Sequence, residues 1–199
     1  MRNAMRTVAM AAAVAVVTAG TAMAQKAAPA FELPDVNGTK HALAQYAGKT
    51  VVLEWTNYGC PFVRKFYDAG AMQSLQQTYT GKGVVWLSIC SSAPGKQGNL
   101  TKEEWLASIA KDGVKATAVL LDPDGTVGKA YGAKTTPHLF VINADGNIAY
   151  QGAIDDKPST KAEDIAGARN YLKAALDALL AGGTVETAET KSYGCSVKY

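Results

Sequence analysis

The sequence has little of the two residue types that crosslink small proteins or bind metals in them. Of 199 residues, only three are cysteines and two are histidines. Three cysteines exclude a disulfide-rich scaffold, and an odd number leaves at least one thiol free, reactive or paired with another molecule. Hydrophobic residues make up 48% and charged residues 19% of the chain, which is typical of one globular domain with an ordinary core.

The sequence also lacks a strong excess of charge of either sign. It contains 20 basic and 17 acidic residues, and two of the basic ones, Arg2 and Arg6, lie in the first few positions. Without them the chain is close to neutral. This balance gives no argument for nucleic acid or a membrane surface as a partner.

Long hydrophobic runs are missing as well, except near the N-terminus. Residues 8–19 form an uncharged run of 12 residues, which is too short to span a bilayer. The run follows Arg2 and Arg6, and residues 22–24 (AMA) supply the small residues of a signal-peptidase site. We therefore predict a signal peptide over residues 1–24, cleaved after Ala24, and a periplasmic or secreted protein with no membrane insertion. Such compartments are oxidising, so thiols there tend to pair.

The rest of the chain alternates between strand and helix patterns. Expected strands are residues 50–56, 83–90, 116–121, 138–142 and 147–152, with short extended pieces at 31–46 around an Asn37-Gly38 turn. Expected helices start after Cys60 with a break at Gly70, at a Thr101–Glu104 capping box, at Thr126, and at a Thr160–Glu163 cap running through Leu179.

This order of elements predicts an α/β fold with a central mixed sheet, helices on both faces and an N-terminal β extension. The domain covers residues 25–181 and a polar tail covers 182–199. Right-handed crossovers make strands 50–56 and 83–90 parallel neighbours, so their C-terminal ends share one edge of the sheet. Sites form at such edges, and Cys60 follows one strand end while Cys90 lies at the other.

Cys60 is the strongest candidate for chemistry. Pro61 follows it and suits the first turn of a helix, where a missing N–H costs little. A thiol at a helix N-terminus faces unpaired N–H groups and the positive end of the helix dipole, and both favour the reactive thiolate. The alternative is an inert buried cysteine.

Several motifs resemble one known family. Residues 31–35 (FELPD), residues 48–53 (GKTVVL) and Cys60-Pro61 are similar to the redoxin branch of the thioredoxin-like superfamily, which includes the alkyl hydroperoxide reductase/thiol-specific antioxidant (AhpC/TSA) group. Residues 135–137 (TTP) resemble its cis-proline loop. The resemblance implies a thioredoxin-like fold and an exported thiol-dependent oxidoreductase without cofactor or metal. Its substrate would be a thiol or disulfide protein or a peroxide, and a redox partner would complete the cycle.

The resemblance also suggests roles for residues around Cys60. Glu54 looks like the counterpart of the buried acid that moves protons in thioredoxins, the alternative being an edge acid paired with a lysine. Pro137 would be cis and leave Thr136 to bind an extended peptide through its backbone. Arg64, one turn past Cys60, would stabilise a thiolate or an anionic substrate, or would simply be solvated.

The chain departs from the dithiol members at Val63, where they carry a second cysteine. A resolving thiol must therefore be distant or belong to another molecule. Cys195 is the first candidate, because its tail is long enough to fold back and places Gly194 and aromatic residues around it. Cys90 is the second candidate. The alternatives are a structural staple for Cys195 and a small strand-end residue for Cys90.

Two other functions remain open on the sequence alone. A peroxiredoxin-like thiol peroxidase would have Thr or Ser three residues before its cysteine and Pro seven before, where this chain has Asn57 and Leu53. A non-catalytic thioredoxin-fold binding module would use its cysteines for one structural disulfide. Metal transfer would need a second cysteine near Cys60, which the motif lacks.

Overall fold

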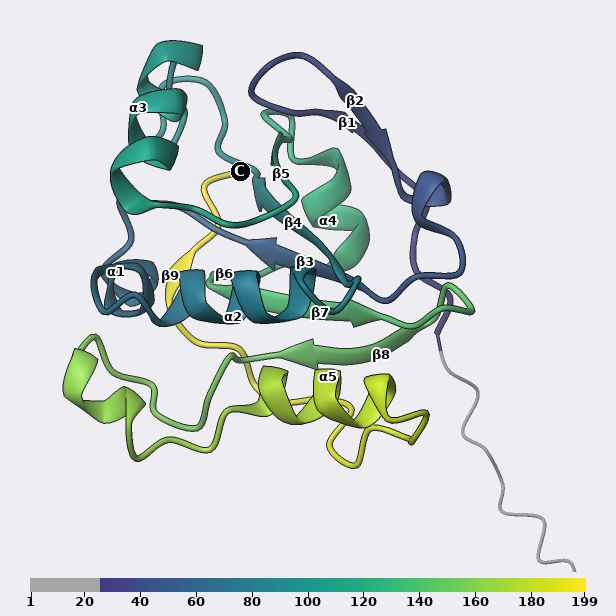
Figure 1. The fold of residues 1–199 in the computed structure, drawn as a ribbon. Coiled ribbons are helices and arrows are strands. Elements are labelled where there is room, and N and C mark those ends of the chain that lie inside the picture. The colour runs from purple at the N-terminus through teal and green to yellow at the C-terminus, as the bar shows by residue number, and fades with distance from the viewer. Residues whose placement is uncertain (1–25) are drawn as a thin grey trace, which may run out of the picture.

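A computed structural model describes residues 26–199, and the predicted signal peptide lies outside them. Its central sheet has the strand order β5-β4-β3-β7-β8 (Figure 1). The bounds are β3 (Val51–Trp55), β4 (Val85–Cys90), β5 (Ala118–Leu121), β7 (His138–Ile142) and β8 (Ile148–Gly152). Strands β3, β4 and β5 are parallel, whereas β7 and β8 run antiparallel to their neighbours. The predicted mixed sheet, the parallel β3–β4 pair and the terminal hairpin are confirmed.

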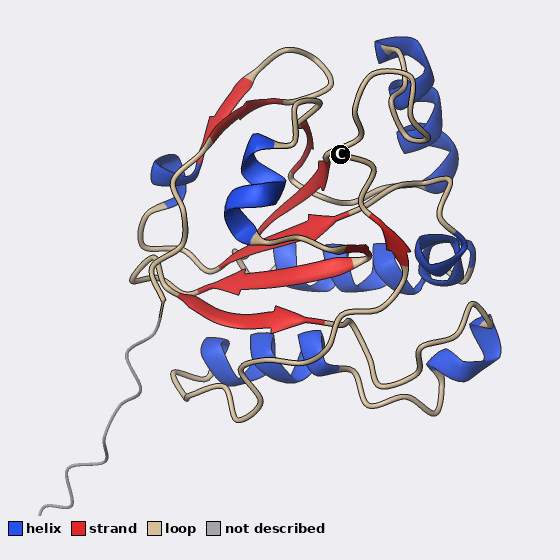
Figure 2. Ribbon diagram, turned by 180° about the vertical axis from the view of Figure 1, so that it is seen from behind, coloured by secondary structure: helices blue, strands red, loops and turns tan. Residues whose placement is uncertain are grey.

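Helices cover both faces of the sheet, as predicted. They are α1 (Pro61–Asp68), α2 (Ala71–Thr80), α3 (Lys102–Asp112), α4 (Thr126–Tyr131) and α5 (Tyr171–Leu180), with 3-10 turns η1 (Leu43–Tyr46) and η2 (Ala162–Ile165). Helix α2 lies in front of the sheet in Figure 1, and the view from behind in Figure 2 shows α4 on the opposite face. Among the described residues no helix is long and apolar enough to cross a membrane.

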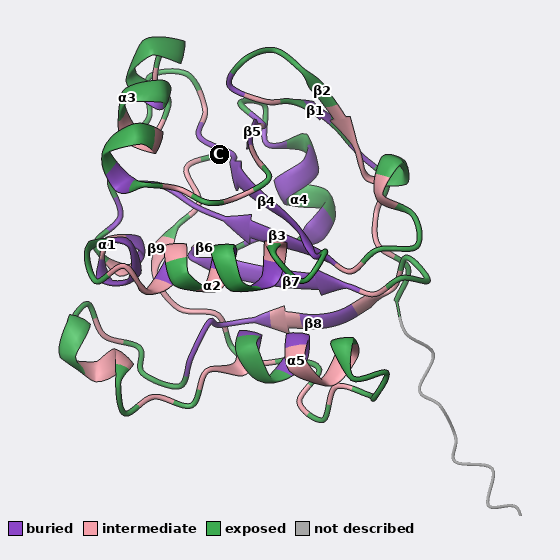
Figure 3. Cartoon of the chain, in the orientation of Figure 1, coloured by how far each residue is buried: buried purple, intermediate pink, exposed green. Residues whose placement is uncertain are grey.

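The residues of β3 alternate between two apolar layers. Val52 packs in the layer covered by α1, α2 and α5, whereas Leu53 and Trp55 pack in the layer covered by α4. All five residues of β3 are buried, and Figure 3 shows the central strands as the buried centre of the molecule. Because side chains alternate along a strand, Glu54 shares the layer of Val52.

Local signals in the sequence set several of the element boundaries. Gly70 separates α1 from α2 with a positive φ of 70°, a conformation that favours glycine. The capping box of α3 is present, since Thr101 N donates to Glu104 Oε2 and Glu104 N donates to Thr101 Oγ1. Strands β1 (Glu32–Pro34) and β2 (Lys40–Ala42) form the predicted N-terminal hairpin.

The start of the last helix differs from the prediction. Thr160 and Glu163 do not cap it, because η2 forms there and α5 begins at Tyr171. The cap is Asn170, whose side chain accepts a hydrogen bond from Lys173 N at 2.8 Å. Tyr171 N also donates to the Ile154 carbonyl, which ties the helix start to the end of β8. The capping-box pattern at Thr160 and Glu163 therefore does not start the helix, because the Asn170 cap is supported by a contact with a distant part of the chain.

The tail forms a strand that the sequence pattern does not predict. Strand β9 (Cys195–Ser196) pairs antiparallel with β6 (Thr135–Thr136), which lies directly before the cis Thr136–Pro137 bond. In Figure 1 the yellow tail runs from α5 past β6 toward the upper edge of the sheet. The tail thus crosses the edge at which β3 and β4 end.

Candidate functional site

Cys60 begins α1 as its N-cap residue. Its backbone is extended, with φ −84° and ψ 125°, and Pro61 occupies the first helical position. The Cys60 carbonyl accepts hydrogen bonds from Val63 N at 3.0 Å and Arg64 N at 2.9 Å, which start the helix. The thiol therefore lies where the helix dipole is positive, as expected from the Cys-Pro sequence.

The tail brings Cys195 to Cys60. In the β6–β9 pair Cys195 is opposite Thr136, and Cys60 Sγ lies 3.1 Å from the carbonyl oxygen of the same Thr136. The close approach requires a glycine before Cys195. A Cβ on Gly194 would be 2.1 Å from the Thr136 oxygen, and Gly194 has φ +133°.

The surroundings of Cys60 favour its thiolate. Burial alone would raise the pKa of Cys60, because the side chain is fully shielded from solvent. Hydrogen bonds from the Cys195 thiol and from the backbone N–H groups of Cys195 and Val63 outweigh burial and lower that pKa below its usual value. These donors come from the helix start and the tail.

Cys195 has the opposite character. Burial and the neighbouring Cys60 sulfur raise the pKa of Cys195 to about 11. Both cysteines are free thiols in the structure, and Cys195 is partly exposed whereas Cys60 is not. As the pH rises, the first proton of the pair is therefore lost from Cys60, and Cys195 stays protonated as its hydrogen-bond donor.

The structure places Cys90 in a different environment. Its sulfur lies 3.3 Å from Ser92 Oγ and 3.5 Å from the Gly98 carbonyl oxygen. No helix begins at Cys90, and burial raises its pKa. Neither of the other cysteine sulfurs is among its described hydrogen-bond partners. The second resolving candidate therefore lies at the predicted edge but outside the pair of thiols.

Glu54 is fully buried, as the sequence pattern indicates. Four donors bind its carboxylate at 2.8–3.1 Å: Tyr67 Oη, Gln76 Nε2, Trp86 Nε1 and Ser88 Oγ. Burial raises the pKa of Glu54 even though these hydrogen bonds lower it. None of the four bonds joins it to Cys60, so a proton passing between them would need a further carrier.

Arg64 points to carboxylates rather than to the thiol. Its Nη1 lies 2.6 Å from Asp112 Oδ2 and its Nη2 3.1 Å from Asp112 Oδ1, while Asp68 accepts from the same guanidinium. These contacts join α1 to the end of α3. Within residues 26–199 no hydrogen bond links the Arg64 guanidinium to the Cys60 thiol.

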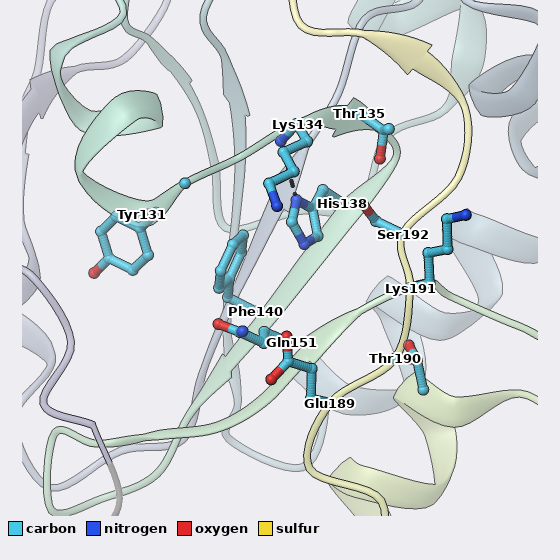
Figure 4. Close-up of a pocket in the computed structure, with 11 residues that line it drawn as sticks. Tyr131, Lys134, Thr135, His138, Phe140, Gln151, Glu189, Thr190, Lys191 and Ser192 are labelled. Carbon is cyan, nitrogen blue, oxygen red and sulfur yellow. Dashed lines mark hydrogen bonds between the residues drawn. The ribbon is translucent and has the colours of Figure 1, made fainter.

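A cavity of about 600 Å³ lies on the other side of the cis-proline loop. Figure 4 shows His138 and Phe140 of β7 facing it, with the tail residues Glu189 and Lys191 across from them. His138 Nδ1 accepts from Lys134 N at 3.2 Å, and burial lowers the pKa of His138 to about 4. The histidine is therefore neutral at physiological pH, and no cysteine lines this cavity.

Sequence reasoning missed a buried ion pair beside the site. Lys65 of α1 lies 3.2 Å from Asp155, and Tyr193 of the tail donates a hydrogen bond to the same carboxylate. Lys65 and Asp155 are 90 positions apart, so no local pattern in the sequence predicts their contact. The aromatic residue near Cys195 was a signal only that the tail would pack against the body.

In the described part of the chain no group of three or more His, Cys, Asp or Glu side chains could hold a metal ion.

Comparison with known proteins supports the fold described above. The redoxin family model matches residues 23–172, whereas no curated protein matches. A hypothetical protein from Sinorhizobium meliloti 1021 is 27% identical, with 90% of this chain and 96% of that chain covered and a TM-score of 0.75. An uncharacterised conserved protein from Geobacillus kaustophilus is 28% identical, with 88% and 91% covered and a TM-score of 0.75.

A third structure, provisionally assigned as thiol:disulfide interchange protein DsbE from Chlorobium tepidum, is 26% identical. The match covers 64% of this chain and 82% of that chain, with a TM-score of 0.50. The fold neighbours thus include thiol–disulfide oxidoreductases. Because the family model spans most of the chain and the neighbours share its fold, the chain belongs to the redoxin family of the thioredoxin-like superfamily.

Proposed function

We propose that this protein is an exported thiol–disulfide oxidoreductase in which Cys60 is the nucleophile and Cys195 the resolving thiol. One observation carries the proposal: β9 pairs Cys195 with Thr136, whose carbonyl oxygen lies 3.1 Å from the Cys60 sulfur, and hydrogen bonds from Cys195 lower the pKa of Cys60. Cys195 thereby takes the place of the second cysteine that Val63 replaces in the helix. The signal-like segment at residues 1–24 supports export.

The proposed reaction is thiol–disulfide exchange in two steps. The Cys60 thiolate attacks one sulfur of a substrate disulfide, a Cys60–substrate bond forms, and the other substrate sulfur leaves and takes a proton. Cys195 then loses its proton and attacks the Cys60 sulfur. A Cys60–Cys195 disulfide forms, and the second substrate sulfur leaves as a thiol. A partner dithiol reduces the new disulfide, and the reverse sequence oxidises a substrate.

Access to Cys60 supports a role for the tail. The Cys60 side chain has no exposed surface, whereas Cys195 is partly exposed. A bulky disulfide therefore reaches Cys60 only after β9 leaves β6. That movement also frees the backbone of Thr136, which we propose binds an extended substrate segment beside Pro137.

A second candidate is a thiol peroxidase, and the burial of Cys60 favours it. A small hydroperoxide passes a covered entrance more readily than a protein does. The Cys60 thiolate would attack the terminal peroxide oxygen and release an alcohol or water, and with one proton from solvent Cys60 would become a sulfenic acid. Cys195 would then attack that sulfur, forming the same disulfide and releasing water.

A trapping experiment tests the proposal. We expect the mature protein to reduce a model peptide disulfide, and Cys195→Ser to accumulate a mixed disulfide at Cys60 that mass spectrometry identifies. The matched variant Cys90→Ser should turn over normally. Peroxide consumption lost in Cys60→Ser, without any disulfide reduction, would select the peroxidase. A Cys60–Cys195 bond that no dithiol reduces would indicate the non-catalytic module.

A further inference from the structure

Helix α1 carries a second unusual feature one turn beyond Cys60. The Lys65 side chain is 0% exposed, and its Nζ lies 3.2 Å from Asp155 Oδ2, whose side chain is 1% exposed. The Lys65 ammonium also donates to the Lys157 carbonyl at 2.9 Å. Taking both charges out of water is costly, so a buried ion pair is weak evidence for a stabilising role.

Tyr193 completes this cluster from the tail. Its hydroxyl donates to Asp155 Oδ1, the oxygen that Lys65 does not bind. Its ring packs edge-on against Phe62 at 5.9 Å between centroids, and Lys65 Nζ lies 5.8 Å from its centre. We call Lys65, Asp155 and Tyr193 the anchor cluster.

We infer that the anchor cluster is a positioning device that holds Cys195 on Cys60. The inference rests on the proposed function, in which Cys195 resolves the mixed disulfide. One helix carries Cys60 at its start and Lys65 in its body, so both are fixed on one rigid element. Tyr193 is two residues from Cys195. The hydrogen bond from the Tyr193 hydroxyl to Asp155 therefore fixes the tail two residues from Cys195 and keeps the Cys195 sulfur close to the Cys60 sulfur.

Contacts made by other tail residues show why the anchor cluster has the most direct effect on Cys195. On one side Thr190 Oγ1 accepts from Ala153 N at 2.9 Å, and on the other Tyr199 Oη donates to the Ala133 carbonyl at 2.8 Å. These contacts pin the flanks of the tail to the body. Between them, Tyr193 makes the side-chain hydrogen bond nearest in sequence to Cys195, so its loss would loosen the pair of thiols most directly.

The chemistry of the cluster also suits a contact that must break and reform. When the tail leaves, Asp155 keeps its bond to Lys65 and its bond from Lys157 N, so the carboxylate does not lose its charge partner. Only the tyrosine hydroxyl exchanges its partner for water. The cluster thus biases the tail toward the closed position without locking it there.

Tyr193→Phe isolates this effect, because it removes only the hydroxyl and keeps the ring against Phe62. In a thiol–disulfide buffer we expect the equilibrium constant for the Cys60–Cys195 disulfide to fall about tenfold, the loss of one hydrogen bond to a charged group. For this two-electron couple that is a shift of about 30 mV toward easier reduction. Mixed disulfides at Cys60 should also persist about tenfold longer.

Tyr79→Phe is the matched control. The Tyr79 hydroxyl donates to Asp177 Oδ1 at 2.8 Å, which is the same kind of bond but joins α2 to α5 rather than the tail to the body. We expect this control to leave the disulfide equilibrium unchanged. Urea unfolding of both variants with Cys60 and Cys195 replaced by serine separates effects on the fold from effects on the disulfide.

The outcomes separate the inference from the function on which it rests. If Tyr193→Phe matches wild type, or if Tyr79→Phe shifts the equilibrium equally, the anchor cluster has no positioning role. If the wild-type protein forms no Cys60–Cys195 disulfide, the proposed function itself fails. Asp155→Asn is the second variant, and a disulfide equilibrium equal to wild type in its folded form would also overturn the inference.

Discussion

Cys60 follows the end of β3 and Cys90 ends the neighbouring parallel strand β4, and the two sulfurs differ in the groups that contact them. Cys60 caps a helix and receives hydrogen bonds from the helix start and the tail, which lower its pKa. Cys90 continues into a loop, contacts Ser92 and Gly98, and has a raised pKa. Burial is common to both. The difference indicates that hydrogen bonds from the helix start and the tail, rather than position at the sheet edge or burial, lower the pKa of one thiol and not of the other.

The largest expected effect comes from exchanging each sulfur for oxygen. Cys60→Ser should lower the rate of disulfide exchange at least about a thousandfold, because it removes the nucleophile. Cys90→Ser should keep a rate close to wild type, since a hydroxyl can bond to Ser92 and Gly98 in its place. Rates measured on both purified variants check this. Equal losses of rate in the two variants would contradict the proposed difference between Cys60 and Cys90.

Gly194→Ala should open the tail. The added Cβ meets the Thr136 oxygen at 2.1 Å and the residue has φ +133°, a strain of about 1–3 kcal/mol. If the tail detaches to relieve it, alkylation of Cys60 in the reduced protein accelerates about tenfold or more, while that of Cys90 does not change.

Gly182→Ala provides the matched control, because Gly182 also has a positive φ, +73°, but no atom within 4 Å of an added Cβ. Peptide mapping after timed alkylation measures both sites. Unchanged Cys60 labelling in Gly194→Ala, with the protein folded, would show that the tail does not cover the thiol.

Glu54 links the strands that lead to the two cysteines, because it lies on β3 and accepts a hydrogen bond from Ser88 on β4. Glu54→Gln turns an amide NH₂ toward some of its four donors, and we expect the free energy of unfolding to fall by about 1–3 kcal/mol. Since no bond joins Glu54 to Cys60, the pH profile of Cys60 alkylation should be retained. A displaced profile would instead support the predicted proton-carrying role. Ser88→Ala, which removes one donor, is the comparison variant.

The smallest effect concerns the pKa of Cys60. Cys195→Ala removes a hydrogen-bond donor to the thiolate, so the pKa of Cys60 should rise toward its ordinary value. Because the thiolate is the reacting form, the rate of alkylation then increases at higher pH than in the wild type. Cys195→Ser keeps a donor and should shift the profile less. Ultraviolet absorbance of the thiolate during a pH titration measures each pKa. A profile identical in all three proteins would remove Cys195 as a source of thiolate stabilisation.

Much of the fold could be predicted because its signals are local. The strand before Cys60, the helix start at Pro61 and the turn at Gly70 depend on residues close in sequence. The cap of α5 could not be predicted, since Asn170 competes with an equally good local pattern and the helix start is fixed by the hydrogen bond from Tyr171 N to the Ile154 carbonyl.

The candidate site divides in the same way. The position of Cys60 at a helix start could be predicted from its motif, and its closeness to Thr136 from the topology of the sheet. The bond network of Glu54, the pairing of Arg64 with Asp112 and the ion pair of Lys65 depend on side chains that meet only in the folded chain. Strand β9 could not be predicted, because a strand of two residues is too short to show a periodic pattern. Gly194 beside a cysteine was a local signal of the close approach at this position.

The most direct test is to map the disulfide of the protein over residues 25–199 after mild oxidation. Digestion without reduction, followed by mass spectrometry, should find Cys60 joined to Cys195 and Cys90 as a free thiol, and a dithiol should reverse the bond. A Cys60–Cys90 disulfide, or Cys195 left free while Cys60 is oxidised, would contradict the account.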